Sequence, residues 1–404
     1  MITQPVVFNP FDPVWKADPY PFYQRLRSEA PIGQVPYVGI WYLTRFADCE
    51  SILHNPKVGS DTRKSTFYQR LAESRTVRMP DEVADRRSFL FLDPPDHTRL
   101  RSLVMSAFTP KVINAMRTTI QTLIDELLAL ATDRQQFDLV DEFAYPLAFS
   151  VISNLLGIPS HDQDRFRVWS KDMAGSNDPM MDPPPDVVER QQCALREGSD
   201  YIRAIISSRR EAPRDDLISA LVAAQVAGHQ LTDDEIVSTV TLLVAAGHES
   251  TVSMIGNAVH ALIQHPQQLA YLRRDVRLAR AAIEETLRWD PPVQMTQRIG
   301  LEDLEIEGHH IDQGTPILVV LAAANRDDNA NPDGERFDIT RDNIRHLAFG
   351  MGTHFCLGAA LARAEGVAVL NALVARFPQW ELAGMAVRRE DLVMRGFQAL
   401  PLEV

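Results

Sequence analysis

Apolar residues recur at helical spacing along much of the chain. Between residues 109 and 131, for example, Val112, Met116 and Ile120 follow one another at four-residue intervals. Such spacing places an apolar stripe along one face of an α-helix. The same pattern predicts further helices over residues 144–157, 186–211, 214–227, 232–264, 267–290 and 357–376. Helices are therefore expected to form most of the protein.

The longest pattern, over residues 232–264, is apolar around nearly its whole circumference. A helix of this kind is buried, so we expect it to be the central helix. It opens with Thr232 and Glu235, which have the spacing of a capping box. Strand-like segments are short and lie around residues 37–44 and 293–321. The expected fold is mostly α with a minor β-rich lobe, built as a single domain over residues 1–404.

Charge and cysteine content exclude several classes of protein. The 404 residues include 41 Lys and Arg against 54 Asp and Glu, a net charge of −13. This balance argues against a protein that binds nucleic acid through its phosphates. Three widely separated cysteines argue against a disulfide framework. The first twenty residues show no signal peptide, so we expect a cytoplasmic protein without a membrane anchor.

Residues 175–186, GSNDPMMDPPPD, are the most loop-like interior segment. One interpretation is a mobile lid, and the other is a plain connection between two helices. Composition favours neither of them.

Residue types able to carry chemistry are densest in residues 349–358, FGMGTHFCLG. Gly350 and Gly352 would let the backbone approach a bulky planar ligand closely. Cys356 comes just before a predicted helix, whose free N–H groups and dipole favour a thiolate that can bind a metal. A buried structural cysteine is the first alternative. A zinc site that includes His354 is the second, but no other Cys or His pair has suitable spacing.

Residues 349–358 resemble the haem-ligand loop F-G-x-G-x-H-x-C-x-G of soluble bacterial cytochrome P-450 monooxygenases, and every fixed position matches. The resemblance covers the chain from about Asp18 to Pro401. It implies the cytochrome P-450 fold, with haem b between the long central helix and the helix that follows the cysteine loop. It also implies that Cys356 is the axial thiolate ligand of the haem iron.

Two further segments match the family in the expected order. Glu285 and Arg288 resemble its E-x-x-R pair, and their spacing puts both side chains on one helix face. Such a pair is by itself most often a solvated salt bridge of little consequence. The resemblance implies a structural role near the haem.

The second match, Ala246 to Thr251 (AGHEST), resembles the family's A-G-x-[DE]-T. A carboxylate and a hydroxyl in an apolar helix cost desolvation unless they are functional. The alternative is a kink in which the hydroxyls bond to carbonyls one turn earlier. The resemblance implies that Glu249 relays protons and that Ser250 donates to iron-bound dioxygen. Because serine replaces the usual threonine, its side chain is less fixed and we expect a leakier relay; Thr251 is the other candidate donor.

A buried haem also needs partners for its two propionates. The resemblance implies that these are His97, Arg101, Arg298 and His354, with Phe349 and Gly350 contacting haem in the loop. Surface arginines and a helix-capping histidine are the plain alternatives. It further implies a substrate site lined by Phe89, Leu90, Leu243, Ala246, Gly247, Val293, Gln294, Met295 and Phe397. This lining is apolar with Gln294 as a polar group, which suits a lipophilic molecule such as a macrolide, terpenoid or fatty acid.

The activity implied is insertion of one oxygen atom of dioxygen into such a molecule, by hydroxylation or epoxidation, in secondary metabolism. No flavin or iron–sulfur motif occurs in the chain, so a ferredoxin and its NAD(P)H-dependent reductase are expected to supply electrons. We expect Arg99, Arg101, Arg345 and Arg363 to form a basic docking patch, with strongly salt-dependent electron transfer. Peroxide-driven oxidation, a non-catalytic haem sensor and a haem-free helical protein are the alternatives.

Overall fold

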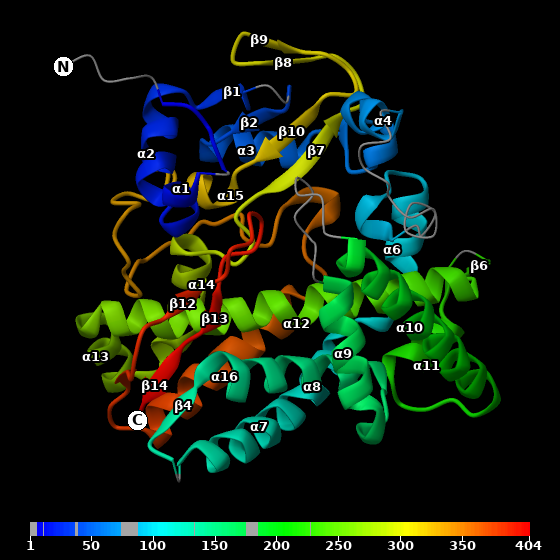
Figure 1. The fold of residues 1–404 in the computed structure, drawn as a ribbon, viewed down its shortest axis with the longest axis vertical. Coiled ribbons are helices and arrows are strands. Elements are labelled where there is room, and N and C mark those ends of the chain that lie inside the picture. The colour runs from blue at the N-terminus through cyan, green and yellow to red at the C-terminus, as the bar shows by residue number, and fades with distance from the viewer. Residues whose placement is uncertain are drawn as a thin grey trace.

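The computed structural model describes residues 6–10, 12–36, 39–73, 88–132, 134–174, 185–226 and 228–404. Figure 1 shows a large helical part and a smaller part that carries the main sheet. The helical part contains α6 (Asp96–Ala107), α7 (Pro110–Thr132), α8 (Tyr145–Leu156), α9 (Gln163–Ala174), α10 (Pro185–Glu211), α11 (Leu217–Ala223), α12 (Asp233–Gln264), α13 (Pro266–Arg274), α14 (Ala279–Trp289) and α16 (Ala359–Arg376).

The sheet-bearing part combines segments from both halves of the chain. Its five-stranded sheet has the order β1 (Ile32–Gln34), β2 (Trp41–Leu43), β10 (Pro316–Val319), β7 (Thr296–Gly300) and β3 (Val58–Gly59), with only β2 and β10 parallel. Its helices are α1 (Pro13–Ala17), α2 (Tyr20–Glu29), α3 (Phe46–His54), α4 (Thr66–Glu73) and α15 (Leu321–Asn325). Strands so distant in sequence share one sheet, which supports the prediction of a single domain.

Smaller strands complete the fold. β4 (Gln136–Asp138), β14 (Pro401–Glu403) and β11 (Glu381–Leu382) form a three-stranded sheet, and β8 (Leu304–Ile306) pairs with β9 (His309–Ile311). β12 (Val387–Arg388) and β13 (Phe397–Ala399) form a hairpin that lies across α12 in Figure 1. The prediction of a mostly α protein with a minor β-rich lobe is confirmed.

α12 is the central helix, as its all-round apolar pattern predicts. It runs through the middle of the molecule and packs against α8, α14 and α16 (Figure 1). The capping box is present, because the Glu235 N–H donates to the Thr232 hydroxyl at 3.2 Å and the Thr232 N–H donates to the Glu235 carboxylate at 2.9 Å. These bonds fix where the central helix begins.

Two predicted helices differ from the structure. Residues 267–290 form α13 and α14, because the Asp275 carboxylate accepts the N–H of Arg277 and starts a short 3-10 turn between them. In 214–227 only Leu217–Ala223 is helical, and the chain continues into the hairpin of β5 (Gln225–Val226) and β6 (His229–Gln230). Of the lid-or-connection segment 175–186, residues 175–184 lie outside the described residues and the last two begin α10.

One described stretch, Leu139–Leu156, is long and apolar enough to cross a membrane. It consists of a π-helical turn followed by α8, and 67% of it is buried inside the protein. Because α8 packs against α12, this stretch is accounted for as a core helix.

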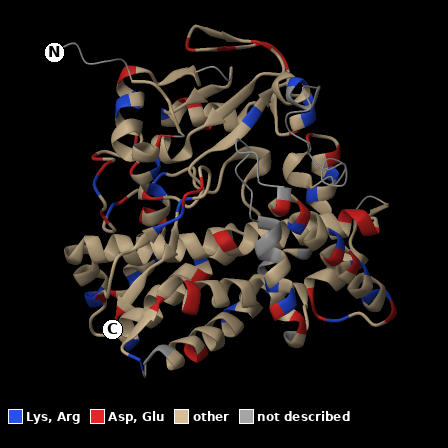
Figure 2. Ribbon diagram, viewed as in Figure 1, with Lys and Arg blue, Asp and Glu red and all other residues tan. Residues whose placement is uncertain are grey.

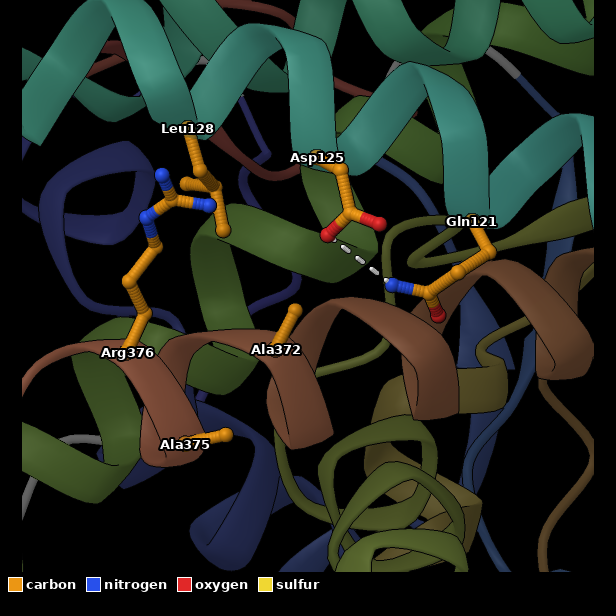
Figure 3. A pocket seen from close by; sticks show the side chains of 6 residues that line it. All are labelled: Gln121, Asp125, Leu128, Ala372, Ala375 and Arg376. Atoms are coloured by element: carbon orange, nitrogen blue, oxygen red, sulfur yellow. Dashed lines mark hydrogen bonds between the residues drawn. The ribbon is translucent and has the colours of Figure 1, made fainter.

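A hollow of about 300 Å³ lies between α7 and α16. Figure 3 shows Gln121 and Asp125 on α7 facing Ala372, Ala375 and Arg376 on α16. It is lined by none of the residues predicted from the sequence to bind cofactor or substrate. The residues predicted to bind cofactor or substrate lie elsewhere, mostly around the cysteine loop and the middle of α12.

Candidate active site

The segment before α16 folds into a tight loop that presents Cys356. The Cys356 N–H donates to the Phe349 carbonyl at 2.8 Å, which closes the loop on itself. Gly350 and Gly352 have φ angles of 65° and 66°, in the region that favours glycine. A side chain at residue 352 would collide with the Leu53 carbonyl of α3. Gly352 therefore allows the loop to pack closely on the backbone of α3, and the approach of this loop to a planar ligand stays a prediction.

Burial raises the pKa of the Cys356 thiol, although the N–H groups of Gly358 and Ala359 and the charges of Arg101 and Arg363 act in the opposite direction. The helix N-terminus therefore favours the thiolate, as predicted, but burial outweighs it. A bound metal ion would reverse this balance, because a coordinating thiol loses its proton.

His97, at the start of α6, and His354, in the cysteine loop, lie with their ring centroids 4.2 Å apart. His97 is only 2% exposed, and both of its ring nitrogens are buried without a hydrogen-bond partner. Arg298 on β7 is 7% exposed and donates at 2.7 Å to the Gln297 carbonyl. Arg101, one turn along α6 from His97, donates to the Phe355 carbonyl. The structure thus brings together all four residues predicted to hold propionates.

The electrostatics of this cluster favour an anionic group. Burial, with His97, Arg298 and Arg101 adding to it, lowers the pKa of His354 to about 3. Burial also lowers the pKa of Arg298 to about 10, against the opposing charge of Asp93. A buried arginine is costly without a countercharge, and buried ring nitrogens are costly without a hydrogen-bond partner, so a ligand that supplies both relieves the cluster. The cluster therefore fits a group with two carboxylates next to Cys356.

The middle of α12 is open between two buried stretches. Ala246 is exposed and Ser250 is half-buried, whereas Leu243 and Thr251 are buried at 9% and 3% exposure. The Ser250 hydroxyl donates to the Ala246 carbonyl at 2.8 Å, and the Thr251 hydroxyl donates to the carbonyl one turn earlier at 3.0 Å. Both hydroxyls thus make the backbone contacts considered as the alternative. Of the two, Ser250 is the one on the open side.

Gly247, predicted to let a ligand approach the α12 backbone, has α8 on the side where a side chain would project. A Cβ atom at this position would lie 3.3 Å from the Ile152 side chain of α8. Its lack of a side chain serves the close packing of α8 against α12.

Glu249 has a partner that the sequence does not reveal. Its carboxylate lies 2.9 Å from the guanidinium of Arg389, which directly follows β12. These residues are 140 positions apart, and the pattern of residues 381–404 gave no prediction of a hairpin. No local signal could have identified this pair.

The Glu285 and Arg288 side chains form a fully buried bidentate pair with two N–O distances of 2.7 Å. Glu285 also accepts the Asp338 N–H at 2.8 Å, and Arg288 donates to the Gly334 carbonyl at 2.6 Å. The pair therefore fixes the irregular segment between α15 and the cysteine loop. Its predicted structural role agrees with these contacts.

The predicted substrate contacts divide into two groups. Phe89 is buried in a 3-10 turn (Phe89–Phe91), its neighbour Leu90 is 40% exposed, and Met295 is 3% exposed within the core of the sheet-bearing part. Val293 pairs with Met394 at the end of the β12–β13 hairpin, which adds a residue that the sequence analysis missed. These residues, with Leu243 and Ala246, remain candidates.

Gln294 and Phe397 are enclosed by other parts of the chain, and their contact with substrate stays a prediction. The Gln294 amide nitrogen donates to the Pro291 carbonyl at 2.8 Å, and the side chain is 3% exposed. Its amide oxygen is buried and has no hydrogen-bond partner within the described structure, so this oxygen is the polar atom that stays a candidate for a substrate contact. Phe397 is also 3% exposed and packs on His260 at 4.7 Å, near the far end of α12 from Ala246.

The predicted basic docking patch is largely neutralised. Arg99 pairs with Glu235, Arg345 lies 3.2 Å from Glu50, and Arg363 lies 2.6 Å from Glu284. Figure 2 shows basic and acidic residues interleaved over the molecule. Of the four arginines, only Arg101 has no carboxylate partner among its described contacts. The expectation of an extended positive surface was wrong, because contacts distant in sequence supply compensating carboxylates.

A cysteine loop leading into a helix, next to a buried cationic cluster and facing a mostly helical core, is the arrangement of a haem-thiolate protein. The model of the family "Cytochrome P450" matches residues 61–391, and the chain belongs to this family. It is a haem-thiolate monooxygenase that binds haem b through a cysteine and uses dioxygen to oxidise a lipophilic substrate.

Similar proteins cover nearly the whole chain. Cytochrome P450 monooxygenase PikC of Streptomyces venezuelae is 39% identical over 96% of this chain and 91% of its own length. The 6-deoxyerythronolide B hydroxylase of Saccharopolyspora erythraea is 37% identical over 96% of both chains. The ligand-free structure of Mycobacterium smegmatis CYP164A2 has a TM-score of 0.87 at 44% identity and covers 98% of both chains. The implied fold and activity are confirmed.

Proposed function

We propose that Cys356 is the residue that holds the haem iron and that His97, Arg101, Arg298 and His354 hold the propionates. The observation that carries this assignment is the pair of buried, partnerless ring nitrogens of His97 beside the cysteine loop. Phe349 and Gly350 shape the same loop. Bound haem supplies the activation of dioxygen, while the protein positions the substrate and delivers protons.

Ser250 is the hydrogen-bond donor on the oxygen side, and Glu249 supplies it with protons. This assignment is supported by the open position of Ser250 and by the burial of Thr251. The Ser250 O–H donates to the Ala246 carbonyl, so it has to rotate away from this carbonyl to donate on the oxygen side, and its oxygen lone pairs can accept a hydrogen bond from water.

A Ser250→Ala variant tests this role. We expect product formed per NAD(P)H consumed to fall roughly tenfold and peroxide release to rise, because a hydrogen bond to a charged group contributes about 1.5 kcal/mol. Product and peroxide are quantified against NAD(P)H oxidation. Thr251→Val is the matched control, because it removes the buried hydroxyl and should leave coupling unchanged. Unchanged coupling in Ser250→Ala would remove Ser250 from the relay.

The substrate is a lipophilic molecule of secondary metabolism, oxidised by hydroxylation or epoxidation. Its apolar contacts are proposed to come from the α12 opening and from Val293 with Met394. A relative named for the hydroxylation of 6-deoxyerythronolide B makes macrolides the first class to try. A library of macrolides, terpenoids and fatty acids is screened for a shift of the haem spin state, and hits are incubated with NAD(P)H and a reductase or with peroxide. Turnover with peroxide but none with NAD(P)H and the reductase system would overturn the dioxygen route.

The electrons are proposed to come from a ferredoxin and its reductase in the cytoplasm. All three cysteines are free thiols, which suits a reducing compartment. The docking surface is centred on Arg101, with Met105 one turn further along α6 and 51% exposed, and Phe355 of the cysteine loop 41% exposed. Because most neighbouring arginines are already paired, apolar contact should contribute much of the affinity.

We therefore expect only moderate salt dependence of electron transfer. A Met105→Glu change should raise the apparent Kd for an acidic ferredoxin about tenfold, equivalent to about 1.4 kcal/mol. Reduction rates are followed at increasing ferredoxin concentration. Met385→Glu, at a residue that is 82% exposed elsewhere, is the control. Equal effects of both substitutions would place docking elsewhere.

A further inference from the structure

The β12–β13 hairpin follows one face of α12. Arg389 pairs with Glu249, Gly396 packs so closely on Ser253 that a side chain would collide with it, and Arg388 donates to the Asn257 side chain at 2.9 Å. The three α12 residues are four positions apart, so they lie in one row. These three contacts fix the position of the hairpin along the helix. Glu249 is the member of the row nearest the exposed middle of α12.

The Arg389 guanidinium is shared between two carboxylates. Its Nη2 lies 2.9 Å from Glu249, and its Nε lies 2.6 Å from Asp391. The Glu249 side chain is 13% exposed, Arg389 24% and Asp391 37%, so the trio runs from the interior towards solvent. Breaking a buried ion pair is costly when it leaves a charge without a partner. Asp391 removes this cost for Arg389 whenever Glu249 moves away.

We propose that Arg389 is a positioning residue for Glu249 and that Asp391 permits Glu249 to leave it during each proton delivery. Arg389 holds the carboxylate in place between turnovers, and Asp391 keeps the guanidinium paired while Glu249 faces Ser250. Glu249 takes up one proton from water and passes one on, so its charge is restored in each cycle. This inference rests on the relay role proposed for Glu249.

Few other charged groups face this trio in the described part of the chain. On α12 the neighbour is His248, which is buried and contacts the Val244 carbonyl at 2.6 Å. On α8 it is Tyr145, whose ring lies 4.6 Å from the guanidinium carbon of Arg167 on α9. Burial lowers the pKa of His248 and raises the pKa of Tyr145. Both side chains therefore stay neutral near pH 7, and the charged groups around Glu249 are Arg389 and Asp391 of the hairpin and, beyond Tyr145, Arg167.

The hairpin does not depend on Arg389 for its position. Asp290, which is 1% exposed, pairs with Arg388 at 3.1 Å and with Arg395 at 3.0 Å, and the Asn257 amide donates to the Arg395 carbonyl at 3.0 Å. These contacts remain when Arg389 is changed, so the variants below should fold and bind substrate normally.

The test compares Arg389→Gln, Arg389→Lys and Asp391→Asn in the haem-loaded enzyme with a substrate identified by the spin-state screen. In Arg389→Gln, product formation should fall about tenfold with more peroxide release, less than the roughly 100-fold effect expected for loss of a proton-transferring group itself. Arg389→Lys should restore most of the rate. The substrate dissociation constant should stay unchanged, which separates positioning from binding.

The pH profile gives the most specific readout. Arg389→Gln removes a positive charge beside the Glu249 carboxylate and Asp391→Asn removes a negative one, so the two variants should displace the pH profile of product formation in opposite directions. If Arg389 and Asp391 had only structural roles, the pH profiles of the two variants would not move in opposite directions. Unmoved profiles, or displacement of both in one direction, would overturn the proposal.

Together with Arg389→Gln, the variants Glu249→Gln and Glu249→Gln/Arg389→Gln form a double-mutant cycle. If Arg389 acts through Glu249, its substitution should have no further effect in the Glu249→Gln background. A Glu249→Gln variant with normal product formation would overturn the relay role itself. A low rate in Glu249→Gln with a normal rate in Arg389→Gln would overturn only the inference about Arg389.

Discussion

A Cys356→Ala variant is expected to lose the carbon monoxide spectrum that is characteristic of thiolate-ligated haem. Cys356 is the cysteine next to the cationic cluster, and two N–H groups and two arginines partly offset the burial that raises the pKa of its thiol. Neither other cysteine offers such a site. Cys49 is fully buried in α3, and Cys193 is exposed on α10. The measurement is the reduced carbon monoxide difference spectrum of the haem-loaded protein.

Cys193→Ser is the matched control and should keep the thiolate spectrum. Cys356→His should bind haem through an imidazole and give a different spectrum, with monooxygenase activity lost, because thiolate donation favours cleavage of the O–O bond. A thiolate spectrum that persists in Cys356→Ala would assign the ligand to another residue.

The second large effect is expected for Glu285→Gln. Both partners of the Glu285–Arg288 pair are 0% exposed, so the change leaves a buried guanidinium without its countercharge. Removing one partner of a buried pair costs about 3–5 kcal/mol, a large share of a typical stability of about 5–15 kcal/mol. Glu285 also holds the Asp338 N–H and Arg341, so the segment before the cysteine loop should loosen.

Two measurements check this prediction: urea unfolding, and haem content after expression. The control is Glu29→Gln, which breaks a pair between Arg25 and Glu29 with side chains 43% and 44% exposed. That pair is screened by water, so its loss should change stability little. Similar midpoints for both variants would show that the buried pair is not a main support of the fold.

Several parts of the site were predictable because they are encoded locally. The loop at 349–358, the Glu285–Arg288 pair and the Glu249–Ser250 pair each occupy a few consecutive residues. The capping box at Thr232 is similar, because its two hydrogen bonds join residues three apart. Backbone conformation and helix-face geometry follow from such short patterns.

Other parts depended on contacts between distant segments. The sequence pattern did not show that Gln294 is buried against the N-terminal region or that Phe397 packs against the end of α12. Pairing of Arg345 with Glu50, 295 residues away, cancelled part of a predicted basic patch. The sequence around a hydrophobic or charged residue does not show which distant segment it will contact in the folded protein.

The sequence by itself determined the central helix, the cysteine proposed to bind the haem iron and the family. The tertiary structure decided which hydroxyl on α12 faces the open side, that the buried ring nitrogens of His97 lack partners, and that Arg389 lies against Glu249. The physical reason is that periodicity and capping act within one or two helical turns. Ion pairs and burial depend instead on which surfaces the completed fold brings into contact.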